Sequence, residues 1–61
     1  MKAEVGDYIY SDFFDSWLLI HKIIDDKNWY FTHEGKVMKA QTRLTYYMEK
    51  DLFRKNPFKL Q

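Results

Sequence analysis

Few residues of this chain could do chemistry, and their spacing fits no known kind of catalytic or metal site. His21 and His33 are the only histidines, and no carboxylate stands at metal-ligand spacing from either one. The chain has no cysteine, which excludes disulfides and Cys-x-x-Cys pairs for zinc or redox chemistry. Both histidines are therefore expected to be ordinary polar strand residues.

The acidic pairs are equally unlike a functional site. Asp12 with Asp15, and Asp25 with Asp26, lack the glycine and the distal glutamate of a calcium loop. Aspartate is also common in turns for local hydrogen-bonding reasons. The only two glycines cannot form a phosphate-binding loop, no serine sits in a glycine elbow, and 61 residues leave little interior for a substrate pocket. We expect a protein that is not an enzyme and that needs no metal or cofactor.

The aromatic side chains carry the stronger signal. They make up 20% of the chain, more than so small a core can hide. Trp17, Trp29 and Phe31 are expected mainly in the core, whereas Phe13 and Phe14 stand in a polar loop and are expected at the surface. Exposed apolar patches usually mark partner surfaces. The predicted partner-binding residues are Phe13, Phe14, Asp15 and Trp17; the alternative is that one of the two phenylalanines folds inward.

Basic side chains carry a second signal. Residues 1–31 hold six acids and three bases, whereas residues 32–61 hold three acids and seven bases. Such asymmetry can mark a basic face that follows a phosphate backbone while rings stack on bases. The alternative nucleic-acid-binding residues are Lys39, Arg43, Arg54 and Lys55. The competing interpretation is a solvated face that keeps a small protein soluble.

Local patterns predict a mainly β domain with one helix. β-branched and aromatic runs bounded by turn residues predict strands at 8–10, 17–24, 29–33, 37–39 and 52–55. If Ile24 faces Trp29 across the hairpin, then Ile20 faces His33. This register predicts a core face of Leu18, Ile20, Ile24, Trp29 and Phe31.

The period changes after Thr42. Leu44, Tyr47, Met48 and Leu52 recur at helical spacing, and Thr42 can cap the N-terminus of such a helix. A strand with Leu44 and Met48 on one face is the open alternative.

The order of these elements resembles the Src-homology-3-like small barrels, a group that includes KOW and Tudor modules. The matching pieces are Val5-Gly6-Asp7-Tyr8-Ile9-Tyr10, Trp17-Leu18-Leu19-Ile20, Trp29-Tyr30-Phe31 and the stretch from Thr42 to Lys55. The resemblance implies an α+β fold: a small barrel of about five short strands with one short helix before the last strand. The helix after Thr42 looks longer than the single turn usual in that architecture. Barrels of this kind bind peptides, methylated lysines, RNA or other proteins.

In style, the chain also resembles the short, aromatic-rich early proteins of tailed bacteriophages, many of which bind and inhibit a host protein. We therefore expect a single domain over 1–61, with an ordered core at 4–55 and a tail at 56–61. Its expected function is to bind a protein, as a phage-type inhibitor in the host cytoplasm, with nucleic-acid binding as the alternative. The longest apolar run is only four residues, so no membrane segment is expected. Closure into a homodimer by surplus aromatic side chains is a further alternative.

Overall fold

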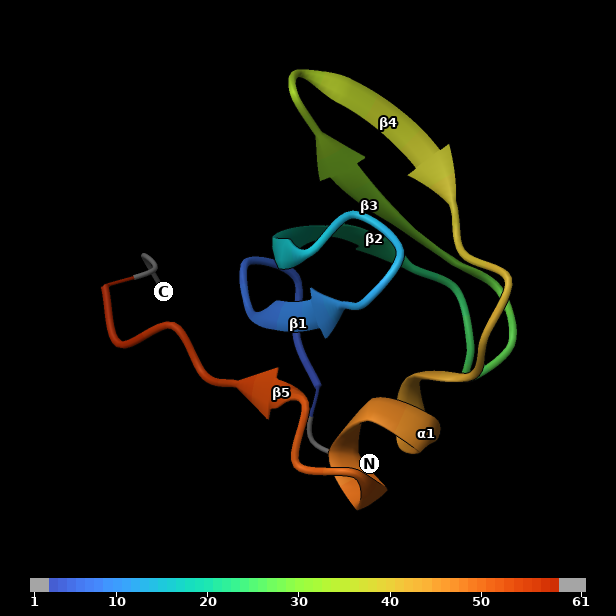
Figure 1. Ribbon diagram of the computed structural model, residues 1–61. Coiled ribbons are helices and arrows are strands. Elements are labelled where there is room, and N and C mark those ends of the chain that lie inside the picture. Colours follow the sequence, from blue (N-terminus) through green and yellow to red (C-terminus); the bar gives the residue numbers. More distant parts are fainter. Residues whose placement is uncertain (1–2, 59–61) are drawn as a thin grey trace.

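Five antiparallel strands and one helix make up the described part of the chain, residues 3–58 of a computed structural model (Figure 1). The strands form one sheet in the order β4-β3-β2-β1-β5. The elements are β1 (Tyr8–Ser11), β2 (Ser16–Ile23), β3 (Trp29–His33), β4 (Lys36–Lys39), α1 (Leu44–Glu49) and β5 (Phe53–Arg54). The predicted mainly β domain, with five strands and a short helix before the last one, is confirmed.

The sheet does not close into a barrel, which corrects that part of the expectation. β4 and β5 are its two edges, and no pairing within residues 3–58 joins them. β5 has only two residues and uses them to pair with β1. The β3–β4 hairpin projects away from β5 (Figure 1), so the edges are too short and too far apart to form a closing ladder.

The register of the central hairpin differs from the predicted one. Ile23, rather than Ile24, lies opposite Trp29, and Ile20 lies opposite Phe31. The predicted pairing of Ile24 with Trp29 is therefore wrong. Ile24 follows the end of β2 and is 60% exposed.

The β2–β3 hairpin keeps one apolar face although its register differs from the predicted one, and the reason is a β-bulge in β2. Between Ile20 and Lys22, β2 carries His21, which has no opposite residue on β3. One extra residue on one strand shifts the pairing and bends the strand. Strict alternation along β2 cannot anticipate this shift.

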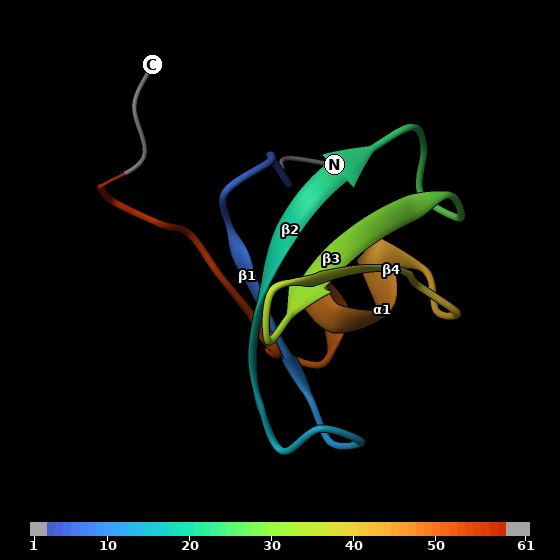
Figure 2. The same ribbon diagram turned by 90° about the horizontal axis from the view of Figure 1, so that it is seen from above.

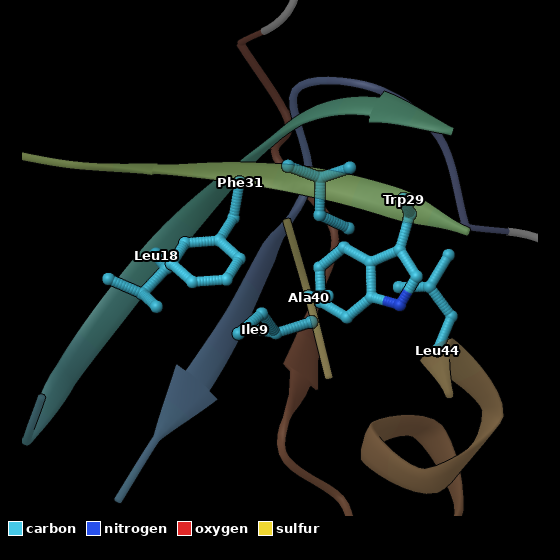
Figure 3. Close-up of a cluster of buried hydrophobic side chains, with 7 residues drawn as sticks. Ile9, Leu18, Trp29, Phe31, Ala40 and Leu44 are labelled. Atoms are coloured by element: carbon cyan, nitrogen blue, oxygen red, sulfur yellow. The ribbon is translucent and has the colours of Figure 1, made fainter. Parts of the chain in front are cut away.

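The core lies between one face of the sheet and α1 (Figures 2 and 3). The core prediction is confirmed at four of its five positions and wrong at the exposed Ile24. The Trp29 ring packs against Tyr47 of the helix at 5.8 Å, and its indole N–H donates to the Thr42 carbonyl at 2.7 Å. The buried apolar residues are Ile9, Leu18, Ile20, Trp29, Phe31, Ala40 and Leu44.

Residues 44–49 are helical, so the strand alternative for this segment is wrong. Thr42 is not the cap; Arg43 occupies that position without a side-chain hydrogen bond. The capping group comes from the β2–β3 turn, where Asp26 Oδ1 accepts from the Thr45 N–H at 2.9 Å and Asp26 Oδ2 accepts from Thr45 Oγ1 at 3.0 Å. The Leu44 N–H also donates to the Asp26 carbonyl at 3.0 Å. A carboxylate distant in sequence thus satisfies the free amides of the first turn.

The two ends of the described chain meet at Asp7, whose side chain is fully buried. Asp7 Oδ2 accepts from the Glu4 N–H at 2.9 Å and from Lys55 Nζ at 3.1 Å, and Oδ1 accepts from the Asn56 N–H at 3.1 Å. The Asn56 amide group donates in turn to the Gly6 carbonyl at 3.0 Å. The segment after β5 is therefore bonded to the segment before β1.

The predicted tail at 56–61 begins with this bonded Asn56, and its last three residues lie outside the described residues. Within residues 3–58, no helix has the length and apolar character needed to cross a bilayer.

Substituting the core should separate buried from exposed isoleucines. Ile20→Asp places a charge where the side chain is 0% exposed, and it should unfold a domain whose core contributes only about 3–5 kcal/mol. Ile24→Asp is the matched control, and its melting temperature should stay within a few degrees of the wild type. Thermal unfolding is measured by circular dichroism. Equal melting temperatures for the two variants would contradict the assignment of Ile20 to the buried face of the sheet.

Removing the buried carboxylate should loosen the junction of the chain ends. Asp7→Ala leaves two backbone amides without their acceptor, and we expect it to lower the free energy of unfolding by about 2–3 kcal/mol. Asp12→Ala removes an exposed carboxylate and should change it by less than about 0.5 kcal/mol. Urea unfolding measures the stability of both variants. Identical midpoints for Asp7→Ala and Asp12→Ala would show that the bonds of Asp7 to the two chain ends do not stabilise the fold.

Candidate functional site

In the loop between β1 and β2, the two phenylalanines that the sequence predicts at the surface differ in exposure, although their rings meet edge to face with centroids 4.9 Å apart. Phe13 is 89% exposed. Phe14 turns inward, with its ring centroid 4.0 Å from that of His33 and 6.1 Å from that of Phe31. The Phe14 N–H donates to Ser11 Oγ at 3.2 Å, which holds the loop in this arrangement. Phe13 matches the surface expectation, and Phe14 follows the inward alternative.

Phe13 stands between two neighbouring hollows. The larger has a volume of about 410 Å³ and is lined by Phe13, Phe14, Phe31, Met38, Lys39, Gln41, Thr42 and Tyr47. The smaller has a volume of about 200 Å³ and is lined by Tyr10, Ser11, Asp12, Phe13, Thr42, Tyr46, Tyr47 and Leu52. Because both hollows share Phe13, Thr42 and Tyr47, they form two halves of one groove, here named the Phe13 groove.

The walls of the Phe13 groove come from two segments that are far apart in the sequence. The β1–β2 loop supplies one wall, and the segment from β4 through α1 supplies the other. Tyr46 and Tyr47 meet edge to face with centroids 5.2 Å apart. Burial raises the pKa of Tyr47 above its ordinary value of 10.0. The groove offers aromatic and apolar surface with a few polar groups, including Asp12 in the smaller hollow and Lys39 in the larger, and such a lining suits a mainly apolar ligand.

The other two predicted partner-binding residues, Asp15 and Trp17, lie in a second cluster around Tyr10. The Tyr10 hydroxyl donates to Asp15 Oδ1, and the Tyr10 and Trp17 rings meet edge to face at 5.5 Å. The guanidinium carbon of Arg54 lies 4.6 Å from the centre of the Trp17 ring. Trp17 is 40% exposed, so its expected place in the core is wrong. The hydrogen bond to Asp15 is the main cause that raises the pKa of Tyr10.

The four predicted nucleic-acid-binding residues are not brought together in one cluster: Arg43 and Lys55 are paired with carboxylates, and only Lys39 and Arg54 share one face of the sheet. Arg43 Nε lies 3.8 Å from the Asp26 carboxylate at the start of α1, and Lys55 is bonded to Asp7. Lys39 and Arg54 lie on the two opposite edge strands.

Sequence reasoning did not assign Met38, Thr42, Tyr46 and Tyr47 to the candidate site. The helical spacing of Tyr47 indicated a core contact, which it also makes. That this helix stands opposite a loop about thirty residues earlier in the chain follows only from the folded structure. Within residues 3–58, no group of three or more His, Asp or Glu side chains could hold a metal ion.

Comparison of the chain with protein-family models, with curated proteins and with solved structures finds no match.

The Tyr10–Asp15 hydrogen bond should be visible in the titration of Tyr10. Asp15→Asn keeps a residue that tolerates the φ of 51° found there, but it replaces the carboxylate by a weaker, neutral acceptor. We expect the pKa of Tyr10 to fall toward its ordinary value of 10.0. The titration can be measured by NMR on protein whose tyrosines are labelled at Cζ. Asp12→Asn is the control and should lower the pKa less, because the charge of Asp12 is the weakest of its causes.

The raised pKa of Tyr10 also determines how the stability of the protein changes with pH. Because the pKa of Tyr10 is raised in the folded state, its contribution to stability is complete below pH 10.0 and is lost as the pH rises through the folded-state pKa. The Asp15→Asn variant should lose less stability than the wild type over this alkaline range. An unchanged Tyr10 titration in Asp15→Asn would show that the bond is absent in solution.

Proposed function

We propose that this chain is a small, non-enzymatic protein-binding module that holds an extended peptide segment of its partner in the Phe13 groove. The observation that carries the proposal is the position of Phe13, which is 89% exposed and stands between two hollows. Exposure alone does not mark a binding site, since Phe58 is almost equally exposed, but an exposed ring that borders two hollows forms part of a larger apolar surface of the kind that partners cover. Aromatic rings at the centre of an interface contribute on the order of 2 kcal/mol or more each.

The shape and chemistry of the groove favour an extended ligand. Two hollows on either side of one ring suit a peptide whose successive inward side chains enter one hollow each. The walls are mainly aromatic or aliphatic, with Thr42, Gln41 and the tyrosine hydroxyls among the neutral polar groups and with one charged residue, Asp12 or Lys39, in each hollow. The preferred segment therefore carries two apolar or aromatic side chains and few charges.

The strand order supports the Src-homology-3-like part of this proposal. The strands follow one another as an antiparallel meander, the fifth strand returns to the first, and the helix precedes the fifth strand. The open sheet and the two-residue β5 are departures from a closed barrel.

In this proposal the partner is a host protein met in the bacterial cytoplasm. That choice rests on the resemblance in style to the short, aromatic-rich early proteins of tailed bacteriophages.

A matched pair of exposed phenylalanines tests the groove. Phe13 is 89% exposed and Phe58 is 87% exposed, but only Phe13 lines the groove. Peptides of about ten residues, selected from a random library on the wild-type protein, should bind about thirtyfold more weakly to Phe13→Ala, which corresponds to about 2 kcal/mol. Binding to Phe58→Ala should stay unchanged, and both variants should melt within a few degrees of the wild type.

Two results would overturn the proposal. One is a set of selected peptides that bind Phe13→Ala as tightly as the wild type. The other is a peptide-induced pattern of amide NMR shifts that leaves Thr42, Tyr46 and Tyr47 unaffected.

A further inference from the structure

The face of the sheet turned away from α1 has an unusual composition. Residues directly opposite each other on neighbouring strands share a face, so the pairing shows which side chains point outward. One such row contains one residue from each strand. In order across the sheet these residues are Arg54, Tyr8, Leu19, Thr32 and Val37. This row crosses all five strands, and its Leu19 and Val37 side chains are 37% and 53% exposed. We name this surface the outer face.

The outer face carries aromatic rings. Tyr8 and Tyr30 lie on it by register, and the Tyr10–Trp17 pair extends it at the end near the β1–β2 loop. The Arg54 guanidinium lies over the Trp17 ring, so this ring offers its flat side to a planar cationic group. Ring faces and guanidinium planes are the surfaces on which unpaired nucleic-acid bases stack.

The charged residues within the strands of the outer face are cations, and the Asp15 carboxylate lies at one end of this face, where it is bonded to Tyr10. Lys22, Tyr30 and Lys39 are directly opposite one another on β2, β3 and β4, so a lysine flanks the ring on each side. Arg54 adds a cation on β5. None of the five described strands contains Asp or Glu. A face with cations and no carboxylates among its strand residues complements a polyanion.

We infer that the outer face binds single-stranded nucleic acid, with its rings stacking on bases and Lys22, Lys39 and Arg54 neutralising phosphates. An open sheet with outward rings suits splayed, unpaired bases, whereas a duplex keeps its base faces stacked inside. A second copy of this chain fits poorly, because a twofold interface would place the same cations against each other. The site shares Lys39 and Tyr10 with the Phe13 groove but lies mainly on the other face of the sheet, so its existence does not depend on the protein-binding proposal.

The residues for the test are chosen to avoid that groove. Lys39 also lines the larger hollow, whereas Lys22 and Arg54 line neither. The test variant is therefore Lys22→Gln with Arg54→Gln. The matched control is Lys27→Gln with Lys50→Gln, which makes the same change in net charge at exposed positions outside the strands.

The probe is a fluorescently labelled oligonucleotide of about twelve nucleotides, as oligo(dT) and as oligo(U), with a DNA duplex of equal length for comparison. We expect both single strands to bind more tightly than the duplex, measured by fluorescence anisotropy. The test variant should bind at least about tenfold more weakly, and the slope of log K against log salt should flatten by about 1.4, or about 0.7 for each lost phosphate contact. The control should change affinity less than about threefold.

Two measurements on the wild type keep the test valid if the test variant fails to fold. Trp29 is 0% exposed and Trp17 is 40% exposed, so a base that stacks on the outer face should quench the fluorescence of Trp17. Amide NMR shifts induced by the oligonucleotide should gather at Lys22, Tyr30 and Arg54, with Tyr46 unaffected.

Several results would overturn the inference. The first is no binding of either single strand at about 50 mM salt, where phosphate contacts are strong. The second is an equal loss of affinity in the test and control variants, which would mean diffuse attraction without a site. The third is preferred binding of the duplex. The fourth is a protein partner that covers the outer face and is not displaced by the oligonucleotide.

Discussion

The buried carboxylate of Asp7 is the contact on which the arrangement of the strands depends most. It is bonded to an amide before β1 and to an amide and an ammonium group after β5. Without cysteine, a chain of 61 residues has no covalent means of joining its ends. Burying a charge is costly and rarely adds much net stability, but a buried carboxylate accepts only a particular set of donors. Asp7 therefore acts mainly by selecting one register for the two-residue β5, which has little pairing of its own to define it.

That register also decides what the outer face presents. Successive side chains of a strand point to opposite faces. With Phe53 opposite Ile9 and packed on the core, Arg54 must point outward, where it meets Trp17. At the opposite side of the core, Asp26 caps α1 and the Trp29 indole holds the Thr42 carbonyl. These long-range bonds fix the helix so that Tyr46 and Tyr47 can face the β1–β2 loop.

Features set by neighbouring residues could be predicted from the sequence, and features set by distant residues could not. The strand at 29–33 has the predicted bounds because its apolar alternation and its flanking turns are local. The helix at 44–49 follows from the spacing of Leu44 and Tyr47. The bulge at His21, the cap by Asp26 and the open sheet depend on how separate segments meet. The same limit applies to the candidate site: the polar loop predicted Phe13 and Phe14 at the surface and left open that one of them folds inward, and only the packing of Phe14 against Phe31 and His33 decides which one does.

The distribution of rings connects the size of the domain with its two candidate surfaces. Of the twelve aromatic side chains, Trp29 is fully buried and Phe31 is buried with 9% exposure, because a sheet with one six-residue helix encloses a small core. Most of the other rings lie wholly or partly at the surface, and many of them belong to the Phe13 groove or to the outer face, whereas Phe53 packs against the core and Phe58 lies outside both surfaces. Tyr10 is the one ring that belongs to both, since it lines the smaller hollow and contacts Trp17. Substitutions at sites this well separated generally add independently. The groove and the outer face can therefore be altered one at a time, except at Tyr10 and Lys39.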